Sequence, residues 1–156
     1  MMDIYTVSFF GHRQIENALT VENRLESIIR NLLIEKTYVE FLVGRNGEFD
    51  LLATSTVRRS KRAVRDDNSS LVLVLPYLTA EYTNDQASFD RYYDEVEVSS
   101  AAAQGHFKAA IQTRNREMID RSDLVLCCIQ HRSGGAYQSV QYALKHGKQV
   151  LNLAGT

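Results

Sequence analysis

The chain has 156 residues, of which 44% are hydrophobic, 9% aromatic and 24% charged, and its formal net charge is −1. This length and composition predict a single globular domain, 1–156, and argue against disorder. The near-neutral charge argues against a general attraction to nucleic acid or to an anionic membrane. No apolar run approaches the roughly 18 residues of a membrane span, and the N-terminus lacks a basic leader. We therefore expect a cytoplasmic protein with no membrane partner.

The first strand is predicted at Ile4–Phe10, which is rich in β-branched and aromatic residues, and it ends in Gly11, His12 and Arg13. A glycine lets the backbone approach a ligand, and a guanidinium suits phosphate. His12 can form a hydrogen bond or exchange a proton near neutral pH. The alternative is an ordinary strand-to-helix turn with an exposed Arg13. Position at a strand end leaves both interpretations open.

A helix with one apolar stripe is predicted from about Thr20 to Lys36, followed by a strand at Tyr38–Val43 and a second glycine loop. The candidate ligand residues of this loop are Gly44, Arg45, Asn46, Gly47 and Asp50. Asp50 falls in the first turn of the next helix. It is either an acid that interacts with the helix dipole or an acceptor for a ribose hydroxyl or a base edge.

The helix at about Glu48–Val64 ends in a cluster of cations, Arg58, Arg59, Lys61, Arg62 and Arg65. A nucleic-acid patch is one interpretation. Cations are favoured at a helix C-terminus, however, and Asp66 and Asp67 follow directly, so we favour a solvated helix end. A buried strand is then predicted at Leu71–Leu75.

The segment Tyr77–Asp94 is the least regular part of the chain. Its tyrosines suit a lid or side wall for a ligand, or alternatively a short helix packed on the sheet edge. The pattern then predicts a strand at Glu95–Ser99, a linker of small residues at Ser100–Gly105 and a helix at His106–Asp120.

The run Leu124–Ile129 is apolar without alternation, as in a strand covered on both faces of a parallel sheet. Ser133, Gly134, Gly135 and Ala136 follow and open a helix. A glycine turn between a central strand and a helix N-terminus presents unpaired N–H groups and a positive dipole end, which suits a phosphate. The Ser133 hydroxyl is expected to cap the helix or to bind phosphate.

A last strand is predicted within Gly147–Leu153. Strands alternate with helices along most of the chain, which favours an α/β fold with a mostly parallel sheet flanked by helices. Cys127 and Cys128 are adjacent in a strand and point to opposite faces, so they form neither a mutual disulfide nor a zinc site. No metal site is predicted.

The histidines, His12, His106, His131 and His146, are far apart in sequence and lack ligand spacing. We predict that most of them lie at the surface. Asp120 and Asp123 precede the strand at its N-terminal end, away from the glycine loops, and are predicted to be structural.

Several of these motifs, in this order, resemble those of the SLOG superfamily (the Smf/DprA–Lonely Guy group), and in particular its small bacterial YpsA-like branch. The motifs are Phe10–Arg13, Gly44–Asp50, Arg114–Asn115 with Met118–Asp123, and Ser133–Ala136. The resemblance covers nearly the whole chain. It implies a Rossmann-like three-layer sandwich whose strand-end loops hold a nucleotide-derived ligand, such as a nucleotide or ADP-ribose.

The Lonely Guy enzymes of this superfamily carry a PGGxGTxxE motif whose glutamate serves cleavage of a nucleoside 5′-monophosphate. Aligned without gaps, Gly134 and Gly135 match, but Tyr137, Gln138 and Gln141 replace Gly, Thr and Glu. An amide cannot act as a carboxylate base, so the departure argues against that hydrolysis. It leaves phosphate binding by the turn intact, and no catalytic residue is assigned.

The leading hypothesis is a nucleotide-binding module, either a sensor or a ligand-binding domain. Its phosphate is expected on Ser133–Ala136 and near Gly11 and Arg13, with Arg45 and Asp50 framing the sugar or base. One alternative is a nucleotide N-glycoside hydrolase in which His12, Asp50 or a lid residue replaces the glutamate. Another is a single-stranded DNA-handling protein like DprA. We also expect a homo-oligomer, as domains of this type and size often pair.

Overall fold

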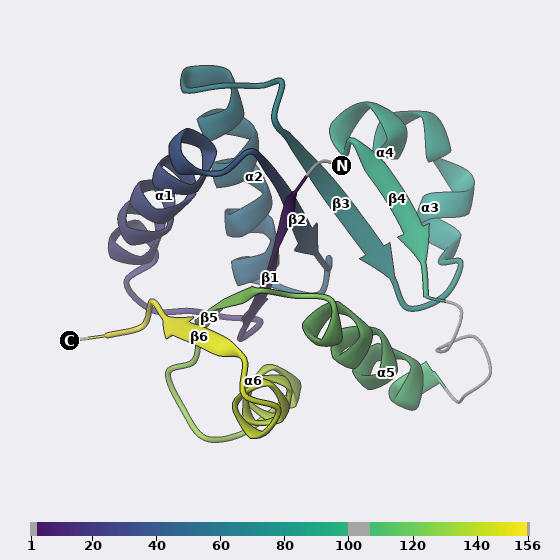
Figure 1. The fold of residues 1–156 in the computed structure, drawn as a ribbon. Coiled ribbons are helices and arrows are strands. Elements are labelled where there is room, and N and C mark those ends of the chain that lie inside the picture. Colours follow the sequence, from purple (N-terminus) through teal and green to yellow (C-terminus); the bar gives the residue numbers. More distant parts are fainter. Residues whose placement is uncertain (1–2, 100–106, 156) are drawn as a thin grey trace.

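The computed structural model describes residues 3–99 and 107–155 and shows a six-stranded parallel sheet in the order β4-β3-β2-β1-β5-β6 (Figure 1). The strands are β1 (Ile4–Gly11), β2 (Tyr38–Val43), β3 (Ser69–Leu75), β4 (Glu95–Val98), β5 (Leu124–Cys128) and β6 (Gln149–Asn152). The helices are α1 (Ala18–Glu35), α2 (Glu48–Ala63), α3 (Ala80–Asn84), α4 (Gln86–Tyr92), α5 (Phe107–Asp120) and α6 (Gly135–Lys145). The predicted linker Ser100–Gly105 and His106 lie outside the described residues.

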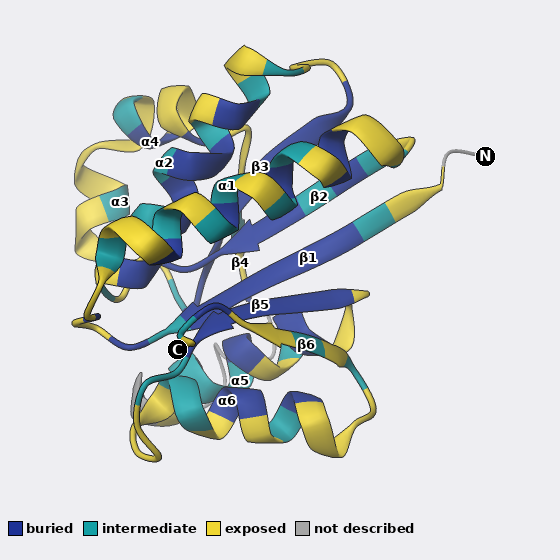
Figure 2. Cartoon of the chain, turned by 90° about the vertical axis from the view of Figure 1, so that its left-hand side faces the viewer, coloured by how far each residue is buried: buried dark blue, intermediate teal, exposed yellow. Residues whose placement is uncertain are grey.

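Helices cover both faces of the sheet, with α1 and α2 on one face and α5 and α6 on the other (Figure 2). Successive β1 side chains divide between two hydrophobic clusters, because side chains alternate across a strand. Phe9 packs on the α1–α2 side and Phe10 on the α5–α6 side. The predicted Rossmann-like three-layer architecture is therefore confirmed.

The two cysteines also divide between these clusters, Cys128 on the α1–α2 side and Cys127 on the α5–α6 side. Both are buried and free, as predicted. Burial raises the pKa of Cys127 to about 12 and that of Cys128 to about 11. Both thiols therefore stay neutral and behave as small hydrophobic side chains.

The cations at the end of α2 face acids from neighbouring elements. Arg59 pairs with Glu26, and Lys61 pairs with Asp94 at 2.5 Å. These ion pairs favour a solvated helix end over a free basic patch, and the role of the cluster stays a prediction.

The segment Tyr77–Asp94 contains two short helices, α3 and α4, which lie beside β4 (Figure 1). Phe89 and Tyr93 are buried in the α1–α2 cluster. The Asp94 carboxylate accepts a hydrogen bond of 2.7 Å from the Leu71 backbone N–H. Of the two predicted possibilities, the structure has the short helix packed at the sheet edge.

No described helix combines the length and apolar character needed to cross a membrane.

The sheet order places β1 between β2 and β5. The chain moves from β1 through β2 and β3 to β4 on one side, and β5 then returns to the other side of β1. The crossover from β1 to β2 and the crossover from β4 to β5 therefore run in opposite directions across the sheet, and the switch point lies between β1 and β5. In open α/β sheets this switch point opens a crevice outside the carboxyl ends of the strands.

We expect Leu25→Ala to lower the free energy of unfolding by about 2–5 kcal/mol, since it deletes a fully buried side chain of α1 and leaves a cavity. Leu19→Ala removes the same atoms from the same helix at a position that is 70% exposed, so its effect should stay within about 0.5 kcal/mol. Urea unfolding of the two variants measures the difference. Equal losses would contradict the burial pattern of α1.

Candidate functional site

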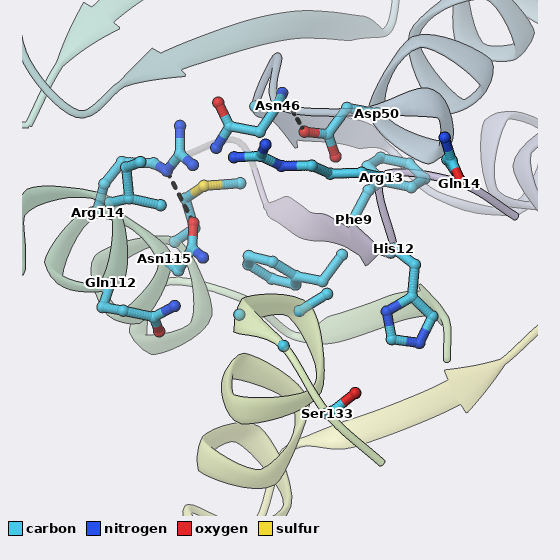
Figure 3. A pocket seen from close by; sticks show the side chains of 18 of the residues that line it. Phe9, His12, Arg13, Gln14, Asn46, Asp50, Gln112, Arg114, Asn115 and Ser133 are labelled. Atoms are coloured by element: carbon cyan, nitrogen blue, oxygen red, sulfur yellow. Dashed lines mark hydrogen bonds between the residues drawn. The ribbon is translucent and has the colours of Figure 1, made fainter. Parts of the chain in front are cut away.

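A cavity of about 560 Å³ opens at the switch point, at the carboxyl ends of β1, β2 and β5 (Figure 3). Ten of the twelve predicted ligand residues line it. They are Gly11, His12, Arg13, Gly44, Asn46, Asp50, Ser133, Gly134, Gly135 and Ala136. The parallel register explains this convergence, because Gly11 at the end of β1 pairs with Cys128 at the end of β5. The loops that follow these strands start from the same point.

Arg45 and Gly47, the other two predicted ligand residues, lie outside the cavity lining. Arg45 donates to the Glu81 carboxylate at 2.7 Å and to the Tyr93 hydroxyl at 3.1 Å. These bonds link its loop to α3 and to the C-cap of α4. A Cβ at Gly47 would lie 2.6 Å from the Arg13 Cα. Gly47 therefore lets two glycine loops touch, which is a role in the fold.

The N-terminus of α6 is the anion-attracting part of the cavity. The helix starts at Gly135, and the N-cap Gly134 has φ 93°, a conformation that strains any other residue. The first N–H groups of a helix have no intrahelical acceptor and carry the positive end of the helix dipole. Gly134, Gly135 and Ala136 line the cavity, which places this end of α6 there.

The predicted capping role of Ser133 is wrong. Gly134 is the N-cap, and no side chain caps the helix. The Ser133 hydroxyl instead lies 3.0 Å from His131 Nδ1. The other prediction for Ser133, contact with a phosphate, remains a prediction.

Asp50 lies in the first turn of α2, as predicted, and is 9% exposed. Its Oδ2 accepts a hydrogen bond of 2.8 Å from the Asn46 backbone N–H. Burial raises the pKa of Asp50, although the Asn46 N–H and the nearby Arg114 guanidinium act in the opposite direction. Asp50 is the one carboxylate among the described residues that line the cavity.

Arg114 and Asn115 also line the cavity, and sequence reasoning did not place them there. Arg114 is 2% exposed, and it donates to the Val74 carbonyl at 2.9 Å and to Asn115 Oδ1 at 2.8 Å. Burial lowers the pKa of Arg114, but a guanidinium keeps its charge in proteins. The sequence could have indicated this inward position, because Arg114 precedes the apolar Met118 by four residues and so shares its helix face.

Asn115 connects α5 to the start of α6. Its Nδ2 donates to the Ser139 hydroxyl at 3.0 Å, and that hydroxyl donates to the Gly135 carbonyl at 3.0 Å. The buried guanidinium and the helix N-terminus are thus held in one hydrogen-bonded network. Such a network keeps both groups fixed before a ligand arrives.

His131 and His146 are exposed, in line with the prediction that most histidines lie at the surface, and His12 is the buried exception among the described residues. It is 7% exposed and stacks on His131, with ring centroids 3.6 Å apart and an angle of 7° between the planes. The His131 N–H donates to His12 Nε2 at 3.3 Å. Burial, and secondarily the neighbouring His131, lower the pKa of His12.

Gln141, at the position of the Lonely Guy glutamate, is exposed on α6 and does not line the cavity. The hydrolase alternative therefore stays a prediction in which Asp50 and His12 are the candidate groups for proton transfer. Asp123 accepts from the Thr6 N–H at 2.8 Å, and Asp120 accepts from the Tyr142 hydroxyl at 2.8 Å. Both acids are structural, as predicted.

No protein-family model and no curated protein matches the chain. Solved structures do match, and they define the class of fold. One is DNA processing protein A (DprA) from Helicobacter pylori, described for its single-stranded DNA binding mode, with TM-score 0.62 and 16% identity over 94% of this chain and 63% of that one. Another is DprA from Streptococcus pneumoniae, with TM-score 0.65 and 15% identity over 94% of this chain and 49% of that one.

The chain thus spans less than two thirds of each of these DprA proteins and shares their Rossmann-like α/β fold. The comparisons confirm the Rossmann-like fold that the SLOG resemblance implied, and the superfamily itself stays a prediction. The YpsA-like branch remains a prediction.

We expect His12 to make stability depend on pH. Because its folded pKa lies below the ordinary value of about 6.5, the unfolded chain binds the proton first as the pH falls. The stabilising contribution of neutral His12 is complete above about pH 6.5 and is lost as the pH falls towards the folded pKa.

Urea unfolding at about pH 7.5 and about pH 5.5 tests this, with His12→Gln compared to the wild type. The stability lost on acidification should be smaller in His12→Gln. His146→Gln, at the exposed C-cap of α6, should lose as much as the wild type. An unchanged pH dependence in His12→Gln would contradict the assignment.

Proposed function

We propose that the cavity binds a nucleotide or a nucleotide derivative through its phosphate. The observation that carries the proposal is the open N-terminus of α6 in a cavity that also contains the buried guanidinium of Arg114, whose positive charge favours an anion nearby. A buried cation is costly unless it is matched by a polar or charged partner. Its retention beside a helix N-terminus favours an anionic ligand.

The rest of the cavity suits the remainder of a nucleotide. Its volume of about 560 Å³ falls in the range of about 300–1,000 Å³ that is typical of small-molecule sites. Phe10, Ile111 and Met118 supply an apolar part of the lining for a sugar or base. Arg13, which extends into the cavity in Figure 3, adds a second guanidinium. The predicted ligand class, a nucleotide or an ADP-ribose-type molecule, is retained on these grounds.

Binding is tested by thermal unfolding with nucleoside monophosphates, cyclic nucleotides, ADP-ribose and NAD. A ligand at 100 times its Kd should stabilise the protein by about 2.7 kcal/mol. Gly135→Leu should weaken binding by at least about tenfold, since the new side chain starts 2.9 Å from Gln112 Nε2 and occupies the anion position.

Gln141→Leu is the matched control, because it introduces the same side chain on an exposed position of the same helix, outside the cavity. Its affinity should equal that of the wild type. If the wild type shows no shift with any ligand, or if Gly135→Leu binds as the wild type does, the proposal is wrong.

The second candidate function is single-stranded DNA binding, and it is the function that the solved structures support. The fold is shared with the DprA from Helicobacter pylori, which is described for that activity. The net charge of −1 and the paired cations of α2 count against an extended DNA-binding face.

Fluorescence anisotropy with a labelled oligodeoxynucleotide tests this second function. If the chain binds DNA through several phosphates, the affinity should fall steeply between about 50 mM and about 200 mM salt. If Gly135→Leu weakens oligonucleotide binding, the DNA uses the same cavity. Absence of binding at the lower salt would exclude this function for the chain.

A further inference from the structure

Two charged side chains of the cavity wall lie close to Gly44. Asp50 and Arg114 are 9% and 2% exposed, and they enter the cavity from α2 and α5 (Figure 3). A Cβ built on Gly44 would lie 3.1 Å from Asp50 Oδ2 and 3.2 Å from Arg114 Nη1. We call the part of the cavity that is lined by Gly44, Asp50 and Arg114 the Gly44 notch.

Asp50 and Arg114 do not close the notch by pairing with each other. No ion pair within 4.0 Å joins them, and each is held by main-chain groups instead. Asp50 Oδ1 and Arg114 Nη2 have no hydrogen-bond partner within residues 3–99 and 107–155. Neither is among the fully enclosed polar atoms that lack a partner there, so both keep access to the cavity.

The chemistry of the pair restricts what fits between them. An ionised carboxylate only accepts hydrogen bonds, and a guanidinium only donates them. A phosphate offers acceptors alone and would be repelled by Asp50, so it belongs at the N-terminus of α6. The group in the notch must offer a donor to Asp50 and an acceptor to Arg114.

We propose that the Gly44 notch recognises a ligand group that carries a hydrogen-bond donor beside an acceptor, and that it sets the specificity of the cavity. Two parts of a nucleotide have this chemistry, the vicinal hydroxyls of a ribose and the polar edge of a base. This inference rests on the proposed function and deepens it. It divides the cavity into a phosphate position at α6 and a sugar or base position at α2.

The decisive variant is Gly44→Ala. The Gly44 backbone lies outside the left-handed region, so its conformation permits alanine, and the Cβ would press on Asp50 Oδ2 and Arg114 Nη1 at 3.1 and 3.2 Å without removing either charge. The probes are AMP, GMP, CMP and UMP with their 2′-deoxy counterparts, measured by titration calorimetry. For the best-binding probe, Gly44→Ala should raise the Kd at least about tenfold.

Gly155→Ala is the matched control. A Cβ there would also lie 3.1 Å from a guanidinium nitrogen, that of Arg24, but at a position outside the cavity. Its Kd should equal that of the wild type.

Asp50→Asn is the second variant, because its amide oxygen can still accept from the Asn46 N–H while its NH₂ group replaces an acceptor with a donor. It should weaken binding as Gly44→Ala does, with a cooperative thermal transition showing that it folds.

The 2′-deoxy probes identify which group occupies the notch. If removal of the 2′-hydroxyl weakens wild-type binding as Gly44→Ala does, the ribose hydroxyls occupy it. If ribose and deoxyribose forms bind equally and both are weakened by Gly44→Ala, the base edge occupies it.

The inference is overturned if Gly44→Ala and Asp50→Asn bind the nucleotide with wild-type affinity, and the proposed function then still stands. If the wild type binds none of the eight probes, the proposed function for mononucleotides fails and the inference fails with it. The two failures are therefore distinguishable.

Discussion

The pairing of β1 with β2 on one side and with β5 on the other is the constraint on which the cavity depends. Parallel strands all end at the same edge of the sheet, and the opposite directions of the two crossovers separate the helices there. The register sets Gly11 opposite Cys128, so the loops after β1 and β5 begin side by side. The lining groups that follow β1, β2 and β5 are carried to the cavity by this arrangement.

Two of the side chains that line the cavity, Asp50 and Arg114, are charged and buried. The Arg114 guanidinium loses most of its hydration, and in exchange it donates to the Val74 carbonyl and to Asn115. Taking a charge out of water is costly, and partners in the interior often return no more than that cost. Asp50 and Arg114 are both buried and form no ion pair with each other, so they are a poor source of stability. Their arrangement is better explained by recognition than by stability.

The comparison with DprA structures concerns architecture. A common fold hosts many unrelated activities, so function has to be argued from the site itself. The chain spans less than two thirds of each DprA protein, whereas the cavity is formed wholly from its own described residues. Gln141 lies outside that cavity, which separates the glycine turn from the position of the glutamate in the Lonely Guy pattern.

The sequence by itself determined the strands, the helices and the glycine loops, because apolar periodicity and turn residues act between near neighbours in the chain. The run Leu71–Leu75 and the stripe of α1 illustrate this. Only the tertiary structure decided which side chains share the cavity. Strand register stacks His12 on His131 across 119 residues, and the packing of α5 on α6 brings Arg114 to the glycine turn. Such contacts depend on how whole elements dock, which no local spacing encodes.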